Sequence, residues 1–181
     1  LGVRVVQAAG RFVGPREVAA GDFRIQARRF VVATGSMPLV PPIPGLETVP
    51  YLTNETVFDL TERPEHLIVI GGGPIGCELG QAFRLLGARV SVVEMADLLP
   101  KDDPELVDVV RQALRADGID VLEQTRVTGV AKTAAGVAVT VRTAAGERVL
   151  NGSALLLAAG RRPAIDGLGL EAAGIAHDRS G

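Results

Sequence analysis

The sequence has one cysteine, no tryptophan and no long apolar run, and each of these absences narrows what the chain can be. With Cys77 as its single cysteine, the chain forms no internal disulfide and no multi-thiolate metal site, which fits a reducing compartment such as the cytoplasm. No uninterrupted apolar stretch approaches the roughly 20 residues of a membrane-spanning helix. Leu1 begins no basic, apolar signal sequence. We therefore expect a soluble excerpt of a longer protein, with no metal site and no membrane partner.

A surplus of charge of either sign is also missing. Lysine and arginine number 19 against 21 aspartates and glutamates, which gives a formal net charge of −2. Because the basic residues are dispersed among acids, nucleic acid and anionic membranes are disfavoured as main partners, whereas small anionic ligands are compatible with this charge. Hydrophobic residues make up 47% of the chain, enough to form a buried core.

The first section, up to about residue 36, is typical of a β-meander followed by a buried strand. Gly21 and Asp22 form a predicted hairpin tip. The section ends on "FVVATGS", residues 30–36, an apolar strand closed by a small-residue turn, and "LLLAAGR", residues 155–161, repeats that pattern late in the chain. Five prolines then precede Tyr51; they remove backbone donors and fix φ, which predicts an ordered but irregular connector and a domain boundary.

From His66 onward the pattern alternates between strands and helices. "LIVI" is a continuous apolar run, as found in parallel strands that are covered on both faces. After a glycine loop and a first helix comes the strand "ARVSVVE", and then a second helix with Asp103 as N-cap, Pro104 at its first position and Gly118 at its end. The predicted apolar stripes are Ile75, Leu79, Phe83 and Leu86 in the first helix and Leu106, Val109, Val110, Ala113 and Leu114 in the second.

The rest of this section contains a third strand, a meander and a last strand. "IDVLE" is the third strand. After it, apolar residues alternate with polar or small ones, and "TAAG" at 133–136 and at 143–146 predicts two hairpin turns. "ALLLAAG" provides a final buried strand. The order predicts an α/β fold: a Rossmann-like domain with a parallel sheet and a β-meander, preceded by a partial, mainly β segment.

The glycine loop "IGGGPIG" carries the strongest functional signal. Gly71, Gly73 and Gly76 stand in a G-x-G-x-x-G arrangement between a strand and a helix. In this arrangement the first glycine allows a tight turn, the second lets the backbone approach a pyrophosphate, and the third permits close packing of helix on strand, while the helix N-terminus offers N–H groups to the anion. The pattern therefore predicts dinucleotide binding; the alternative is a glycine-rich structural turn.

Glu94 ends the second strand, roughly 20 residues beyond the loop, where a carboxylate can accept hydrogen bonds from the adenosine ribose hydroxyls. The same carboxylate would repel a 2′-phosphate, and no arginine or lysine follows until Lys101. NAD is therefore favoured over NADP. The alternative is a solvated glutamate at a strand end.

Other reactive side chains give weaker signals. Glu78 lies one turn into the first helix, where it is either exposed or buried with a partner. Cys77 has no second thiol and no adjacent histidine, so we expect a small buried core residue. His66 and His177 are expected to be surface residues and not catalytic groups. Nothing in the pattern forms a serine, cysteine or metal hydrolytic site.

Four stretches together resemble a known family: "RRFVVATGSMPLVPPIPGL", "YLTNETVFDL", "VIGGGPIGCELGQAFRLLGARVSVVE" and "LLLAAGRRP". In this order and spacing they resemble the central part of the pyridine nucleotide-disulfide oxidoreductases, most closely the lipoamide dehydrogenase and mercuric reductase branch. Members are FAD-dependent enzymes that pass a hydride from NAD(P)H to FAD and then electrons to a cysteine pair. The resemblance implies NAD and FAD as cofactors and a homodimer for the full-length protein.

The resemblance also implies a domain organisation. Residues 1–55 would be part of the FAD domain with a proline-rich connector, 56–165 the NAD(P)-binding domain, and 166–181 the start of the return to the FAD domain. In the family these two domains are similar units, which accounts for the repeated strand-and-turn pattern.

Residue roles follow from the same resemblance. Thr34, Gly35 and Ser36 would lie close to the flavin, and Glu78 would be a catalytic carboxylate near it. In the family this carboxylate pairs with a lysine of the redox helix, and that lysine is absent from this chain. Pro74 occupies the position of a gate residue over the flavin in some members, next to Ile75 at the start of the cofactor-binding helix. Gly160 and Arg161 match an A-x-G-R turn beside the nicotinamide half of the site.

The chain lacks several parts of the family pattern: the FAD-side glycine loop, the C-x-x-x-x-C pair, the later G-D segment and the C-terminal dimerisation domain. Alone it is therefore not expected to run the full reaction. Two alternatives stay open, an NADH oxidase or peroxidase relative with a single redox cysteine upstream and a nucleotide-binding regulator without turnover. The thioredoxin reductase branch is disfavoured because its cysteine pair lies inside the NAD domain.

Overall fold

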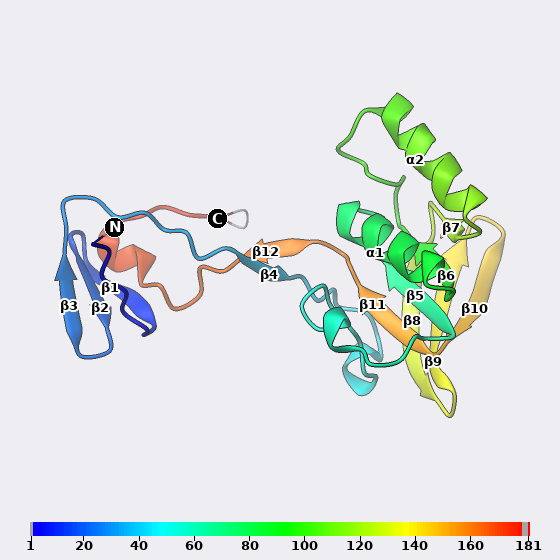
Figure 1. Ribbon diagram of the computed structural model, residues 1–181, viewed down its shortest axis with the longest axis horizontal. Helices are drawn as coiled ribbons and strands as arrows, with labels where there is room; N and C mark the ends of the chain where they lie inside the picture. Colours follow the sequence, from blue (N-terminus) through cyan, green and yellow to red (C-terminus); the bar gives the residue numbers. More distant parts are fainter. Residues whose placement is uncertain (1, 179–180) are drawn as a thin grey trace. The chain divides into compact units, whose positions relative to one another are not determined.

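The structure, a computed structural model, describes residues 2–178 and 181 (Figure 1). The chain divides into two compact units, one formed by Pro38–Gly160 and the other by Leu1–Met37 together with Arg161–Gly181. Each unit has its own hydrogen-bonded sheets, and each is described separately below.

The larger unit has three layers. Along the chain its elements are β5 (His66–Ile70), α1 (Pro74–Leu85), β6 (Arg89–Val93), α2 (Pro104–Ala116), β7 (Asp120–Leu122), β8 (Arg126–Thr133), β9 (Gly136–Thr143), β10 (Gly146–Gly152) and β11 (Ala154–Leu157). A parallel sheet in the order β11-β5-β6-β7 lies between the two helices on one face and an antiparallel meander, β10-β9-β8, on the other (Figure 1). This order confirms the predicted α/β fold.

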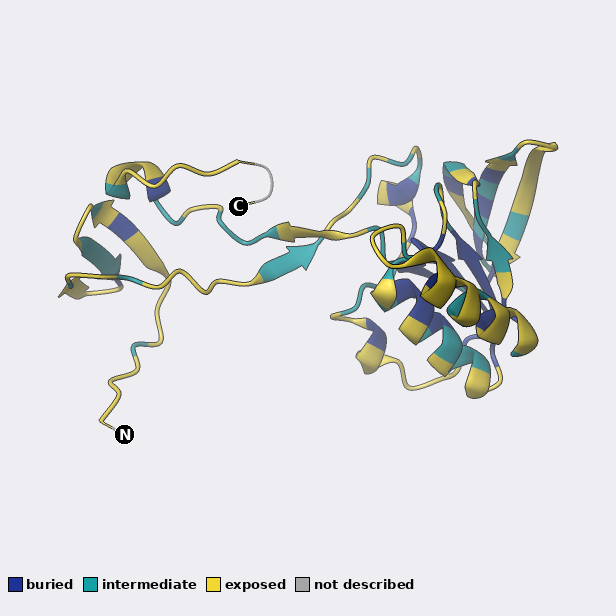
Figure 2. Ribbon diagram, turned by 90° about the horizontal axis from the view of Figure 1, so that it is seen from above, coloured by how far each residue is buried: buried dark blue, intermediate teal, exposed yellow. Residues whose placement is uncertain are grey.

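The core is divided by the alternation of side chains along β5. Leu67 and Val69 are fully buried among residues of the two helices, whereas Ile68 and Ile70 point to the other face and pack with Val139 of the meander. Figure 2 shows the dark-blue strands of the sheet beside the two helices, whose outer faces are yellow. Each fully buried aliphatic side chain of this kind contributes about 1.5–3 kcal/mol relative to an exposed one.

The face that α1 buries differs from the predicted stripe. Gly76, Cys77 and Gly80 are its buried residues, while Leu79 and Phe83 are only partly buried. Leu86, predicted to complete the stripe, is 68% exposed. The helix lies so close to the sheet that small residues make the contact, and a pattern of large apolar residues does not reveal such a face.

The predicted stripe of α2 is confirmed at Leu114, which is buried, and at Val110, which packs against the core, but it is wrong at its other members. Val107 and Leu114 are buried, whereas Leu106 and Val109 are 66% and 65% exposed. Apolar residues occupy adjacent helix positions here, so two stripes fit the sequence, and packing on the sheet selects one. The helix ends are as predicted, because the Asp103 side chain accepts the N–H of Glu105 at 2.9 Å and Gly118 has a φ of 83°. Among the described residues, no helix is long and apolar enough to cross a membrane.

The meander and the proline-rich connector pack together. Both "TAAG" segments form the predicted hairpin turns, pairing Thr133 with Gly136 and Thr143 with Gly146. The connector is irregular, as the prolines predict, with short 3₁₀ turns η1 (Leu46–Thr48) and η2 (Val57–Asp59). It is also ordered, since Val130 donates its N–H to the carbonyl of Pro44 at 2.9 Å.

The smaller unit is mainly β. It contains an antiparallel sheet of β1 (Gly10–Gly14), β2 (Glu17–Ala20) and β3 (Phe23–Gln26), a pair formed by β4 (Ser36–Pro38) and β12 (Arg161–Pro163), and the 3₁₀ turn η3 (Leu170–Ala173). Ala20 pairs with Phe23, so the hairpin tip lies at Gly21 and Asp22 as predicted.

The prediction of a buried strand at "FVVA", residues 30–33, is wrong. These residues belong to no strand, and Val31 is 91% exposed. The matching late segment is β11, which pairs in parallel with β5 along its whole length. A parallel strand needs neighbours with which to share its backbone hydrogen bonds, and no described segment pairs with residues 30–33.

His66 is also placed differently from the prediction, because it is buried (7% exposed) and not on the surface. Its Nδ1 lies 2.6 Å from the carbonyl oxygen of Asn151 and its Nε2 lies 2.9 Å from the hydroxyl of Ser91, so the ring links β5 to β10 and β6. Burial, followed by the charge of Arg89, lowers the pKa of His66 below its ordinary 6.5, although Asn151 and Asp120 act in the opposite direction.

We expect His66 to make the chain acid-sensitive. Since its folded pKa is depressed, the unfolded state binds more protons between that pKa and 6.5, and the free energy of unfolding falls as the pH drops through this window. Urea unfolding at about pH 7.5 and about pH 5.5 should show a loss for the wild-type chain and a smaller one for His66→Gln. Equal losses in both chains would contradict this assignment.

Candidate functional site

The glycine loop follows β5 at the carboxyl end of the parallel sheet, the edge at which ligands bind in open α/β sheets. Gly71 has a φ of 112°, and a Cβ added there would lie 2.3 Å from the carbonyl oxygen of Ala158. A Cβ on Gly76 would lie 1.9 Å from the carbonyl oxygen of Gly71. Both positions therefore require glycine for the loop and helix to pack.

Gly73 is different, because a Cβ added there would meet no described atom within 4 Å. Its φ of −75° and ψ of −177° are also open to any residue. The fold therefore does not need glycine at position 73. The space in front of its backbone is what a pyrophosphate would require.

The helix that follows begins without a capping side chain. Asp103 caps α2, whereas among the described residues no side chain caps α1, which begins with Pro74. Ile75 and Gly76 belong to its first turn, whose N–H groups have no partner within the helix. Such a helix end favours an anion through these donors and its dipole.

Glu94 lies beside this loop, half-buried at the end of β6. One carboxylate oxygen accepts the N–H of Gly72 at 2.7 Å and the other accepts the N–H of Ala96 at 2.8 Å. Each oxygen keeps acceptor capacity, so the carboxylate is held in place and can still accept ribose hydroxyls. The G-x-G-x-x-G motif gave no role to Gly72, although a Cβ added there would lie 2.9 Å from the Cβ of Glu94. The run of three consecutive glycines could have indicated that this position is also crowded.

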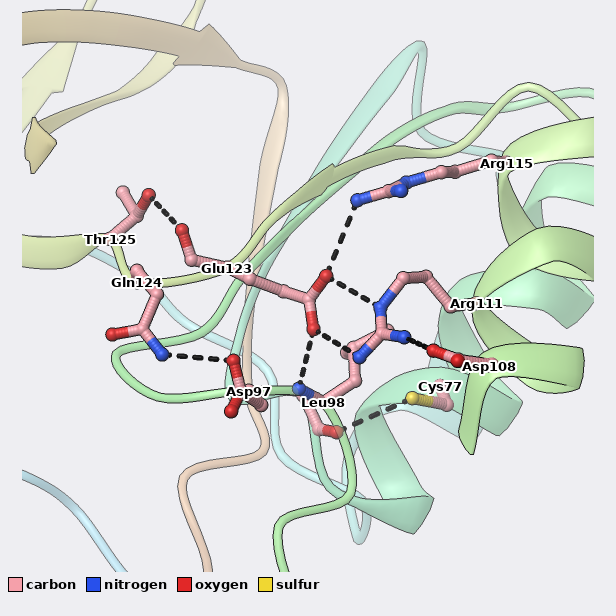
Figure 3. A network of polar contacts seen from close by, with 10 residues as sticks. Cys77, Asp97, Leu98, Asp108, Arg111, Arg115, Glu123, Gln124 and Thr125 are labelled. Atoms are coloured by element: carbon pink, nitrogen blue, oxygen red, sulfur yellow. Dashed lines mark hydrogen bonds and ion pairs between the residues drawn. The ribbon is translucent and has the colours of Figure 1, made fainter. Parts of the chain in front are cut away.

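Glu123, at the end of "IDVLE", is a second carboxylate that the motif did not indicate (Figure 3). Arg111 of α2 binds both of its oxygens, at 2.8 and 2.9 Å, and Arg115 contacts one at 3.3 Å. It also accepts the N–H of Leu98 at 2.9 Å. Burial raises the pKa of Glu123, but these hydrogen bonds and charges outweigh it and hold the pKa below 4.5. A lone charged residue at a strand end gives no sequence signal for such a network.

Cys77 is a buried core residue, as predicted. Burial, together with the carboxylates of Glu94, Glu78 and Glu123, raises the pKa of its thiol to about 11. The protonated thiol is a poor nucleophile. Among the described residues, no group of three or more histidine, cysteine or acidic side chains could hold a metal ion.

Glu78 is exposed on α1. Of the two positions that the sequence left open, the structure shows the exposed one. The pairing with a lysine that the resemblance implies stays a prediction for the longer protein.

The remaining predicted residues lie around β4 and β12. Arg161 donates from Nε to the hydroxyl of Ser36 at 2.7 Å and from its guanidinium to the Ser36 carbonyl. Gly35, with a φ of 71°, accepts the N–H of Ala164 at 3.0 Å. Thr34 is exposed beside it. Gly160 belongs to the larger unit, where its carbonyl accepts the N–H of Leu39 at 3.0 Å. The predicted residues thus form two groups, one in each unit.

A comparison with protein-family models matches residues 1–181 to the family described as pyridine nucleotide-disulphide oxidoreductase. Among curated proteins, a mercuric reductase of Streptomyces lividans is 36% identical, with 96% of this chain and 38% of that protein covered. A dihydrolipoyl dehydrogenase of Thermus scotoductus is also 36% identical, with 99% of this chain and 40% of that protein covered. The chain therefore spans about two fifths of the length of these relatives.

Solved structures give a similar result. The Cu(II) complex of the HOCl-induced flavoprotein disulfide reductase RclA from Escherichia coli superposes with a TM-score of 0.84 at 31% sequence identity, covering 98% of this chain and 40% of that one. A fold likeness at this identity, over nearly the whole chain, agrees with the family match.

Proposed function

Because the chain belongs to the pyridine nucleotide-disulphide oxidoreductase family, we propose that it is the central part of an FAD-dependent enzyme that passes a hydride from NAD(P)H to FAD and electrons on to a redox disulfide. Within this enzyme the larger unit binds the nicotinamide dinucleotide, and the preferred form is NAD. By analogy with the mercuric reductase and the dihydrolipoyl dehydrogenase among its relatives, the substrate of the whole enzyme would be mercuric ion or a lipoamide-type disulfide.

The observation that carries this proposal is the contrast among the loop glycines. Gly71 and Gly76 are needed for packing, but Gly73 is not, since an added Cβ would meet no described atom within 4 Å. A small residue at a position where the fold has room for a larger one points to a ligand that occupies that room. The uncapped start of α1 favours an anion there.

The residues present fit a dinucleotide. Gly73 would border the pyrophosphate, Ile75 and Gly76 would donate their N–H groups to it, and Glu94 would accept the adenosine ribose hydroxyls. The chemistry supplied by the bound cofactors is hydride donation by NAD(P)H and hydride acceptance by FAD. The chain's part is to bind and orient the dinucleotide.

We assign the remaining predicted residues by the family resemblance. Glu78 and Pro74 on α1 would face the flavin, and Gly160 and Arg161 would lie beside the nicotinamide half. Thr34, Gly35 and Ser36 would contact FAD. The domain boundaries are proposed as 1–55, 56–165 and 166–181, and the full-length protein as a homodimer.

Titration of the chain with NADH and with NADPH at matched ionic strength tests the assignment of Glu94. We expect NADH to bind about tenfold more tightly, a difference of about 1.4 kcal/mol, because the fixed carboxylate repels a 2′-phosphate. Glu94→Gln should reduce this preference, and the exposed control Glu47→Gln should keep it. Tighter NADPH binding would overturn the role of Glu94, and binding of neither would overturn the nucleotide site.

The catalytic part of the proposal requires the longer protein. Anaerobic mixing with NADH should bleach the absorbance of its bound flavin. Nucleotide binding without flavin reduction would instead support a regulator without turnover.

A further inference from the structure

We infer that Glu123 is a positioning residue for the proposed nucleotide site: it holds residues 95–99, here called the strap, against Gly72. The inference rests on the proposed function, because it assigns Glu123 a role at that same site. It is carried by contacts on both sides of the strap.

On one side, the strap closes over the peptide of Gly72. Leu99 donates its N–H to the Gly72 carbonyl at 3.0 Å, and the Leu98 side chain, 1% exposed, covers the Gly72 Cα. A Cβ on Gly72 would lie 2.6 Å from Cδ2 of Leu98. The N–H of Gly72 is already bound to Glu94, so strap and carboxylate fix this peptide together.

On the other side, the strap is bound to the end of β7 (Figure 3). Glu123 accepts the N–H of Leu98 at 2.9 Å. Gln124 donates its backbone N–H to the carbonyl of Ala96 at 3.0 Å and its side-chain amide to Asp97 at 2.9 Å. Ala96 in turn donates to Glu94, so the position of the strap determines the geometry of that carboxylate.

The backbone is strained where these links meet. Leu99 has a φ of 47° and Gln124 a φ of 49°, and these are the non-glycine residues with positive φ among the described residues. A left-handed conformation is unfavourable for residues that carry a Cβ. It persists where surrounding contacts over-determine it, and such positions cluster at ligand sites.

Glu123 can act as this anchor because its own position is fixed. Its side chain is 14% exposed and paired with Arg111 through two hydrogen bonds. Asp108 contacts the same guanidinium, so the anchor is continuous with α2. Glu123 therefore acts on the ligand through Leu98 and Ala96, not by touching it.

The test is a set of titrations of the whole chain with two ligands, ADP-ribose and NADH, and with NADPH as the reference for the nucleotide preference, well below the unfolding temperature. Glu123→Ala should weaken both ligands about tenfold and lower the preference for NADH over NADPH, because the strap and Glu94 are released. Glu123→Gln should regain most of the affinity, since its amide oxygen can still accept the Leu98 N–H although the charge pair with Arg111 is lost.

Asp103→Ala is the matched control. It removes the N-cap of α2, the helix that carries Arg111, and so lowers stability, but it should leave both affinities and the preference unchanged. Three results would overturn the inference. They are altered affinity or preference in Asp103→Ala, wild-type affinity in Glu123→Ala, and equal losses of affinity in Glu123→Ala and Glu123→Gln.

A second variant guards against misfolding of Glu123→Ala. Arg111→Met combined with Glu123→Leu replaces the ion pair by apolar side chains of similar size, which is often neutral for stability. It should show the same tenfold loss while remaining folded, and unchanged affinity would overturn the inference. If the wild-type chain binds neither ligand, the proposed function itself fails, whereas wild-type binding with unaffected variants removes only the role of Glu123.

Discussion

A Gly73→Ala chain is expected to keep the wild-type fold and to bind NADH about 100-fold more weakly, a loss of about 2.7 kcal/mol. The added methyl group would meet no described atom of the protein within 4 Å, so it would project into the space assigned to the pyrophosphate. Backbone approach of the phosphate is the reason for glycine at this place in the motif. Calorimetric titration with NADH measures the loss.

The same substitution should leave stability unchanged or slightly increase it. Gly73 precedes Pro74 and already has the extended conformation that a residue before proline prefers. Replacing glycine where the backbone is compatible stabilises by roughly 0.4–1 kcal/mol through the unfolded state. Urea unfolding checks this, so weaker binding cannot be attributed to a damaged fold.

Gly129→Ala is the matched control for the first prediction. This glycine lies on β8, and an added Cβ would meet only the carbonyl of Pro44, at an ordinary 3.8 Å. NADH affinity should be that of the wild-type chain. Undiminished binding by Gly73→Ala would mean that the ligand does not approach this loop, and would remove the main support for the nucleotide site.

The order of elements in the larger unit could be predicted because each depends on local pattern. The capped start of α2 and the "TAAG" turns are formed by neighbouring residues, and the continuous apolar run of β5 indicates a strand that is covered on both faces. The buried faces of the helices could not be predicted as reliably. Gly76 and Gly80 pack because of their smallness, and the choice between Leu106 and Val107 depends on how α2 meets the sheet.

The same distinction applies to the segment at residues 30–33 and to the candidate site. An apolar run identifies a possible strand, but the strand forms only beside partners, and the described chain supplies none. The glycine loop and Glu94 belong to one local motif and could be predicted. Glu123 and Arg111 are ordinary charged residues, and only the fold places them together behind the loop.

Gly76→Ala is expected to destabilise the larger unit by about 3 kcal/mol, which lowers the unfolding midpoint by roughly 10 °C. The added Cβ would lie 1.9 Å from the carbonyl oxygen of Gly71, far inside contact distance. The clashing atom is backbone, in a loop that is itself packed against Ala158, so rotation of a side chain cannot relieve it. Either α1 moves away from the sheet or the turn at Gly71 is distorted.

Thermal unfolding of Gly76→Ala beside Gly73→Ala provides a matched pair, because the same methyl group is added three residues apart in one motif. Alanine gains about 1 kcal/mol over glycine in helix propensity, so a destabilised Gly76→Ala chain would show that packing outweighs it. Wild-type stability in that variant would contradict the close contact of α1 with the loop. If Gly76→Ala loses stability while Gly73→Ala loses only affinity, then within one motif Gly76 serves the fold and Gly73 serves the ligand.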